Sequence, residues 1–177
     1  MAPAMSQEQR ARHIEQVFGT IHSCPLRPIA QARHRYSRRS SRNVPYDPNS
    51  QAKLEIQTQV KQYLRDHYGI THEEFPLTES YVSVNVTFLI SRPISHFTQK
   101  KRSLGIRPNF EMSMPMVQGD IDNFVKLFLD SIQGIFFRND RDVVTISASK
   151  LYTNEPRGRT VYSIRHHEMN IVDLING

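Results

Sequence analysis

The sequence predicts a single α/β (α+β) domain in which about four strands form a mixed sheet and two main helices pack on it. Its 177 residues, 38% hydrophobic and 23% charged, suit one soluble domain with one core. Strand-like and helix-like segments follow one another in the order strand, helix, strand, helix, strand, strand. Strands joined through helices tend to be parallel, whereas the last two, joined by a short turn, should be antiparallel, so we expect a mixed sheet.

The first half of the chain supplies a strand and a long helix. Residues 16–23 (QVFGTIHS) alternate apolar and polar side chains, which predicts a strand. Residues 47–50 (DPNS) offer N-cap side chains for a helix. Apolar side chains then recur at helical spacing through residues 56–68, and Gly69 is expected to end this helix.

The second half supplies the remaining helix and strands. Residues 81–90 (YVSVNVTFLI) are dense in β-branched and aromatic side chains and form the clearest strand. Residues 121–132 carry one apolar face at helical spacing, which predicts the second helix. Residues 143–151 and 160–165 are predicted to be strands of a hairpin that turns at residues 154–158 (NEPRG).

Other segments lack clear periodicity. We expect residues 1–14 to be a flexible N-terminal extension, residues 15–170 to form the domain, and residues 171–177 to be a C-terminal tail. Residues 95–117 form a long segment without helical or strand pattern. Long loops inside compact domains tend to be functional or mobile.

Composition narrows the classes of function. No apolar run approaches the roughly 20 residues of a membrane span, and the first residues lack the apolar core of a secretory signal. We therefore expect an intracellular protein, in the cytoplasm or nucleoid, or inside the host cell if a virus encodes it. The single cysteine, Cys24, is expected to be a small residue near a strand end. A net charge of +6 favours a polyanionic partner such as nucleic acid.

Acidic residues gather around the start of the second predicted helix. Asp120 and Asp122 flank its first turn, where backbone N–H groups are free and the helix dipole favours negative charge. Magnesium prefers such hard oxygen ligands. Lys126 lies four residues after Asp122, on the same helix face, and is placed to neutralise a phosphate. Asp140, in the turn before the next strand, is where a third carboxylate could return to the site.

Each of these residues also has an ordinary structural interpretation. Asp120 is in the position of a helix N-cap, and Asp122 with Lys126 has the spacing of a surface ion pair. Asp140 fits turn chemistry. The residues by themselves leave a metal site and these structural roles evenly balanced.

A longer pattern includes these acidic residues. Its parts are Asp120-Ile121-Asp122-Asn123, Lys126, Leu129-Asp130-Ser131, Gly134, Asn139-Asp140, Val143-Val144 and Lys150. This pattern resembles the core motif of the RusA-type Holliday junction resolvases. A weaker similarity, at Pro28, Arg33-His34-Arg35 and Tyr46-Asp47-Pro48, extends the resemblance to about residues 16–166.

The resemblance implies a RusA-like fold and a homodimer that cuts opposed strands of four-way DNA junctions symmetrically, with Mg²⁺ or, as a substitute, Mn²⁺. It implies that Asp120, Asp122 and Asp140 are catalytic and hold the metal, that Lys126 is the catalytic lysine, and that no small-molecule cofactor or membrane takes part. Two positions depart from the family pattern. Asn139 replaces the first residue of an Asp-Asp pair, and residues 114–118 are apolar where the best-known member has arginines, so the resemblance predicts neither sequence preference nor junction selectivity.

Basic residues are the expected DNA contacts, although a solvated loop is the alternative for each group. The residues are Arg33, Arg35, Arg38, Arg39, Lys100, Lys101 and Arg102. Asp130 is expected to pair with Lys126 one turn away, and Lys150 either reaches DNA or lies on an exposed strand face. Two other functions stay open: a nuclease for other branched or single-stranded nucleic acid, and a non-catalytic DNA-binding protein with the same fold.

Overall fold

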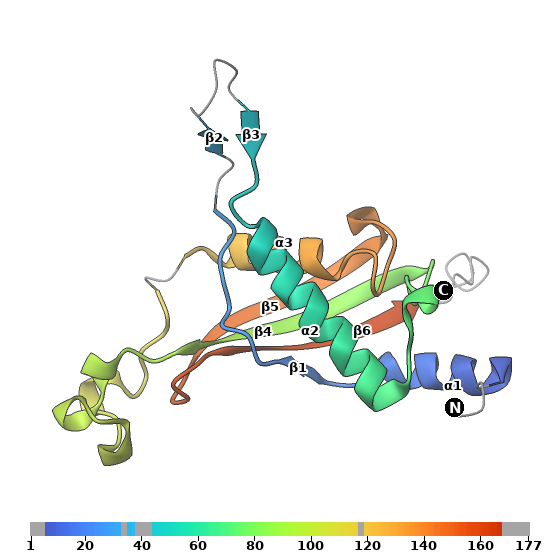
Figure 1. The fold of residues 1–177 in the computed structure, drawn as a ribbon. Coiled ribbons are helices and arrows are strands. Elements are labelled where there is room, and N and C mark those ends of the chain that lie inside the picture. Colours follow the sequence, from blue (N-terminus) through green and yellow to red (C-terminus); the bar gives the residue numbers. More distant parts are fainter. Residues whose placement is uncertain (1–5, 33–34, 38–43, 117–118, 168–177) are drawn as a thin grey trace, which may run out of the picture.

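The computed structural model describes residues 6–32, 35–37, 44–116 and 119–167. Its centre is a four-stranded sheet in the order β1-β6-β4-β5. These strands are β1 (His22–Cys24), β4 (Tyr81–Ser91), β5 (Val143–Thr153) and β6 (Arg159–His167). β6 pairs antiparallel with both β1 and β4, and β4 pairs parallel with β5, so the sheet is mixed, as predicted (Figure 1).

Two helices cover one face of the sheet. They are α2 (Ser50–Tyr68) and α3 (Ile121–Ile132), and both lie where the sequence predicts them (Figure 1). α2 ends because Gly69 adopts a left-handed conformation, with φ of 66°, that favours glycine. No helix in the described ranges combines the length and apolarity that crossing a bilayer requires.

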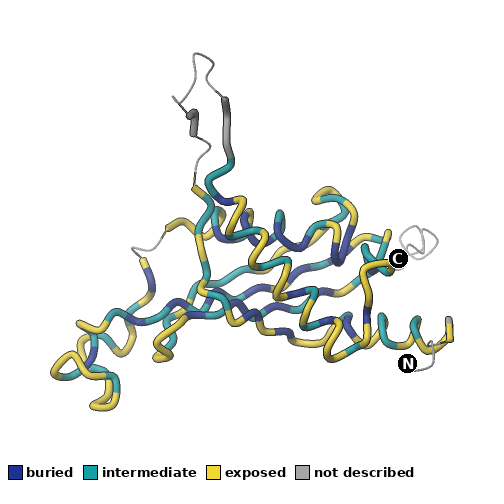
Figure 2. Tube along the Cα trace, viewed as in Figure 1, coloured by how far each residue is buried: buried dark blue, intermediate teal, exposed yellow. Residues whose placement is uncertain are grey.

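The core lies between these helices and the sheet. The side chains of β4 alternate, so that Val84, Val86 and Phe88 are buried against the helices while Asn85 on the other face is exposed. From the helices, Leu64 of α2 and the apolar face of α3 complete the core. Figure 2 shows buried stretches along the central strands and the helices that cover them.

The N-terminal region differs from the prediction. Residues 16–23 were expected to be a strand, but Gln7–Val17 form a helix, α1, and the strand β1 comprises only His22–Cys24. The helix also occupies part of the expected flexible extension. A reciprocal capping box between Ser6 and Gln9 starts α1, and the fully buried Val17 fixes its end to the core.

The predicted hairpin between the last two strands is wrong. β5 and β6 do not pair, because β4 lies between them and pairs with both. The connecting residues 154–158 pass over the end of β4. They come so close that a Cβ at Gly158 would lie 2.3 Å from the carbonyl oxygen of Leu89. A short connection therefore joins strands on either side of the central one.

Two further segments contain regular structure. β2 (Arg35–Ser37) and β3 (Val44–Tyr46) form a separate two-stranded ribbon. Residues 94–110 contain four short 3-10 turns rather than an irregular loop. Figure 1 shows the ribbon and these turns at different places outside the layered core.

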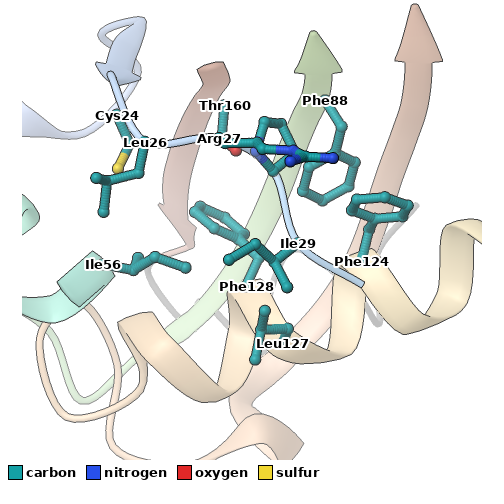
Figure 3. Close-up of a pocket in the computed structure, with 11 residues that line it drawn as sticks. Cys24, Leu26, Arg27, Ile29, Ile56, Phe88, Phe124, Leu127, Phe128 and Thr160 are labelled. Atoms are coloured by element: carbon teal, nitrogen blue, oxygen red, sulfur yellow. The ribbon is translucent and has the colours of Figure 1, made fainter. Parts of the chain in front are cut away.

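Residues 25–32 run from β1 to the ribbon, and we call this segment the strap. It crosses α3 near its start, since the backbone N–H of Gln31 donates a hydrogen bond to the carbonyl of Asn123 at 3.0 Å. Figure 3 shows Ile29 of the strap among Phe124, Leu127 and Phe128 of α3, with which it lines one pocket. The strap thus ties the N-terminal part of the chain to the helix that carries the candidate acidic residues.

Candidate active site

Asp120 and Asp122 lie at the start of α3 with available carboxylates. Asp120 is the N-cap residue, with φ of −76° and ψ of 145°, but its side chain makes no capping hydrogen bond. Asp122 follows in the first turn, and both side chains are exposed. Neither forms an ion pair with a side chain of the described residues. The carboxylate of Asp120 therefore does not cap the helix although the residue occupies the N-cap position, and both carboxylates can bind a ligand.

Two segments, β5 and the strap, hold the backbone that precedes these carboxylates. The ammonium of Lys150, on β5, donates a hydrogen bond to the carbonyl of Gly119 at 2.5 Å. Gly119 has φ of 99°, and a Cβ there would lie 2.8 Å from the Cβ of Ala30 in the strap. The strap's bond from Gln31 to Asn123 completes the frame. The start of α3 is thus positioned by β5 and the strap together.

Lys126 lies one turn after Asp122 and is exposed. No ion pair within 4.0 Å joins it to Asp122 in the described part of the chain, so the structure does not contain the surface pair that spacing allowed. Asp130 was expected to pair with Lys126. It instead forms a salt bridge with Lys53 of α2, with 2.8 Å between the lysine Nζ and the carboxylate Oδ2. Lys126 can therefore approach a phosphate beside the two carboxylates.

Asp140 lies at the opposite end of α3 from this pair. It begins a 3-10 turn directly before β5, in which the carboxylate of Asp142 accepts a hydrogen bond from the N–H of Asn139 at 2.8 Å. The twelve residues of α3 separate this turn from Asp120, a length of roughly 18 Å. The structure therefore brings together Asp120, Asp122 and Lys126, and does not bring Asp140 to them within one chain (Figure 1).

The donor set fits a divalent cation only in part. Two exposed carboxylates that no described cation neutralises suit Mg²⁺, which binds few protein oxygens and retains several waters. Among the described residues, no group of three or more His, Cys, Asp or Glu is close enough to hold a metal ion. The described part of one chain thus supplies an open, two-carboxylate site, in which waters and phosphate oxygens can complete the coordination of the ion.

The basic residues predicted to contact DNA have different surroundings. Arg33, Arg38 and Arg39 lie outside the described residues, and only the backbone of Arg35, in β2, is described. Lys100 and Lys101 are exposed.

Arg102, the last of these predicted contacts, has a structural role. Its guanidinium donates hydrogen bonds to the carbonyls of Asn154 and Arg92, at 3.0 and 2.9 Å. Arg102 therefore joins the 3-10 turns to the connection between β5 and β6.

Sequence reasoning left the role of Lys150 open. In the sequence, Lys150 was noticed only because it belongs to the family motif, in the strand that follows the turn of Asp140. The residue type alone gave no indication of its role. In the structure its ammonium contacts the backbone beside Asp120 and also lies over the ring of Phe124, 5.9 Å from the centroid. These contacts within the chain place it at the site rather than on a remote strand face.

Comparison with known proteins gives two matches. The family model described as Endodeoxyribonuclease RusA matches residues 25–161. The chain is also similar to an uncharacterized protein, YqaN, of Bacillus subtilis (strain 168), with 27% identity over 130 residues, which cover 73% of this chain and 85% of that protein. The range matched by the family model begins after α1 and includes the strap, all of α3 and Asp140.

Proposed function

Because the chain belongs to the RusA family of endodeoxyribonucleases, we propose that it is a magnesium-dependent enzyme that resolves four-way DNA junctions as a homodimer. The observation that carries this proposal is the pair Asp120 and Asp122 at the start of a helix that β5 and the strap hold in place. Both are exposed, and neither pairs with a described side chain. A protein that only bound DNA would gain nothing from two such carboxylates beside a polyanion.

Each residue of the site has a task in phosphodiester hydrolysis. A magnesium ion bound here would supply Lewis acidity and activate water for attack on the phosphodiester. Asp120 and Asp122 would hold this ion, and the free N–H groups of the first turn of α3 favour negative charge there. Lys126, one turn further along, contacts the phosphate oxygens and balances the charge that develops on them.

We propose that the third carboxylate is Asp140 of a second copy. Asp120 and Asp140 lie at opposite ends of α3, so an antiparallel two-fold arrangement of two chains along α3 and β5 brings each Asp140 toward the other chain's Asp120. A two-fold dimer makes two equivalent sites by the same contact. This geometry suits a four-way junction, which has two equivalent strands to cut.

Cleavage of a synthetic four-way junction tests the activity. With Mg²⁺, the wild-type protein should cut two opposed strands, while Asp122→Asn should lower the cutting rate by about a thousandfold and still bind the junction, because ligand removal affects the chemical step. Asp66→Asn, which makes the same change on the exposed side of α2, is the control. Equal cutting of plain duplex and junction would contradict resolution, and preference for flaps or single strands would support the alternative nuclease.

Mixing two inactive variants tests the shared site. Asp122→Asn and Asp140→Asn homodimers each lack one ligand in both sites. In a heterodimer of the two, one site carries both substitutions and the other has every ligand, so nicking of one strand should return. If each site lay within a single chain, the heterodimer would contain no complete site and would remain inactive.

A further inference from the structure

Four arginines surround a pocket beside the C-terminal end of β4. They come from three segments: Arg27 from the strap, Arg92 and Arg102 from the residues after β4, and Arg157 from the connection between β5 and β6. The pocket has a volume of about 380 Å³, and we call it the arginine pocket. Its other lining residues are Ser91, Pro93, Ile94, Pro156 and Gly158.

Within the described part of the chain, no carboxylate lines the arginine pocket. The nearest acidic residue in the sequence, Glu155, already pairs with Arg159 at 3.0 Å. Four guanidinium groups around one space without an acidic partner repel one another, and this arrangement is stabilised when an anion enters. Arginine is suited to phosphate in particular, because its planar group donates two parallel hydrogen bonds to phosphate oxygens.

Two of the arginines form a rigid wall. Arg92 is only 6% exposed, and its guanidinium donates to the carbonyl of Phe110 at 2.6 Å and lies over the ring of Tyr152, 4.8 Å from the centroid. Its buried Nε has no hydrogen-bond partner among the described residues. Arg102 is held by the carbonyls of Asn154 and Arg92. These contacts fix two positive charges and leave a buried donor of Arg92 without a described acceptor.

The other two arginines can close on a ligand. Arg27 and Arg157 are exposed, and neither forms a salt bridge with a described side chain. Gly158 also lines the pocket. Because it has no side chain, it can approach both β4 and the strap: a Cβ there would lie 2.3 Å from the carbonyl oxygen of Leu89 and 2.9 Å from Pro28. The pocket thus combines a fixed wall with two adjustable side chains.

The arginine pocket lies at the same end of the sheet as the start of α3. Phe88 of β4 is in register with Lys150, whose ammonium contacts Gly119, and Ser91 of the pocket lies three residues further along the strand. Three residues of strand span roughly 10 Å. Phosphates succeed one another every ~3.4 Å of helix axis along one strand, so this separation corresponds to a few nucleotides.

We propose that the arginine pocket binds a backbone phosphate of the DNA substrate, a few nucleotides from the bond that is cut. This inference rests on the proposed function and adds to it a site that positions the strand. Arg92 and Arg102, whose guanidinium groups are held by protein acceptors, supply fixed positive charge, while the exposed Arg27 and Arg157 donate to the phosphate and close over it.

The double variant Arg27→Gln/Arg157→Gln tests the inference without removing the structural wall. Binding of a fluorescein-labelled four-way junction is measured by anisotropy without Mg²⁺, at several salt concentrations. We expect the affinity to fall at least about tenfold and the slope of log K against log salt to decrease by about 0.9, as for the loss of one phosphate contact. Arg65→Gln, an exposed arginine on α2, is the control for one lost charge, and thermal unfolding verifies that each variant is folded.

The outcomes separate this inference from the proposed function. If the double variant matches wild type in affinity and salt slope, the arginine pocket does not bind DNA, even if the wild-type protein cuts junctions. If inorganic phosphate stabilises wild type but not the variant, while DNA binding is equal in both, the pocket is a site for free phosphate and the inference is overturned. If DNA binding weakens as expected but no substrate is cut, the pocket stands and the proposed activity fails.

Discussion

At the scale of single residues, Gly119 determines how close the strap can come to the site. Its φ is 99°, and a Cβ at this position would lie 2.8 Å from the Cβ of Ala30, so there is no room for a side chain. The carbonyl of the same residue receives the ammonium of Lys150. A glycine therefore allows three segments to meet directly before Asp120.

The variant Gly119→Ala should lower the free energy of unfolding by about 2–4 kcal/mol, because it combines a strained φ with a steric clash. Gly134→Ala is the matched control, since Gly134 has φ of 74° but a Cβ there would meet nothing within 4 Å. Urea unfolding measures both. Equal losses in the two variants would show that the contact with Ala30 contributes nothing.

His22 is a buried titratable residue away from the acidic site. It is 1% exposed, its Nε2–H donates to the carbonyl of Val17 at 2.9 Å, and burial lowers its pKa below the ordinary value of 6.5. Below pH 6.5 the unfolded chain therefore binds more protons at this position than the folded chain. Stability should fall as the pH drops through 6.5.

The variant His22→Phe should remove part of this pH dependence. Between pH 7 and 5, one titrating group lowers the free energy of unfolding by at most about 1.4 kcal/mol per pH unit, and the variant should show a shallower slope. A residual slope is expected, because burial and the neighbouring Arg92 also lower the pKa of His96. Urea unfolding at several pH values measures the slopes, with the exposed His72→Gln as control. Parallel curves for wild type and His22→Phe would contradict this role.

At the scale of elements, Lys53 joins α2 to α3. Its ammonium lies 2.9 Å from Asp47, before α2, and 2.8 Å from Asp130, on α3. The carboxylate of Asp47 also accepts a hydrogen bond from the N–H of Asn49, and this bond together with Lys53 lowers the pKa of Asp47 to about 2. The salt bridges of one lysine thus connect the two helices that pack on the same face of the sheet.

The variant Lys53→Met should lower the free energy of unfolding by about 1–2 kcal/mol, a value between those of exposed and buried pairs, because two carboxylates are left without their cation. Lys61→Met, on the same helix and without a salt bridge among the described residues, is the control. Chemical unfolding at pH 7 measures both. The difference between them should shrink as the pH falls from about 4 toward 2, where Asp47 becomes protonated, and a constant difference would exclude Asp47 from the network.

At the scale of the whole molecule, β5 is an edge of the sheet beside α3. Ile146 of this strand is 44% exposed although it is in register with the buried Val84 and so points to the helix-covered face, and Val144, two residues before it, is 55% exposed. The strand also connects the turn of Asp140 to Lys150 near Asp120. An apolar edge between the two ends of the site is where the proposed dimer would form.

The variant Ile146→Lys should therefore give a folded monomer that does not cut junctions, because a buried charge at the interface opposes association. Leu54→Lys, at a leucine of α2 that is 56% exposed, is the matched control and should remain dimeric and active. Size-exclusion chromatography with light scattering measures the mass. A dimeric Ile146→Lys variant with wild-type cutting would rule out this edge as the interface.

Much of the fold follows from local pattern. The bounds of α3 and the start of β4 agree with the prediction because apolar periodicity is continuous there. The helix α1 was missed because residues 1–14 are mostly polar and were expected to be a flexible extension, while its stability depends on a capping box and on the burial of Val17. The hairpin of β5 and β6 was wrong because a short connection usually joins paired strands, and nothing local shows that β4 is inserted between them.

The sequence by itself determined the two helices, the mixed character of the sheet, the family, and the position of Asp120 and Asp122 at the start of a helix. These features can be read from the spacing of residues that are close in the sequence, because the periods of helices and strands determine which side chains share a face. Only the tertiary structure decided that Asp140 lies a helix length away, that Lys150 and the strap frame the acidic pair, and that four arginines from three segments meet in one pocket. Those are contacts between residues far apart in the chain, and their geometry depends on strand order and packing.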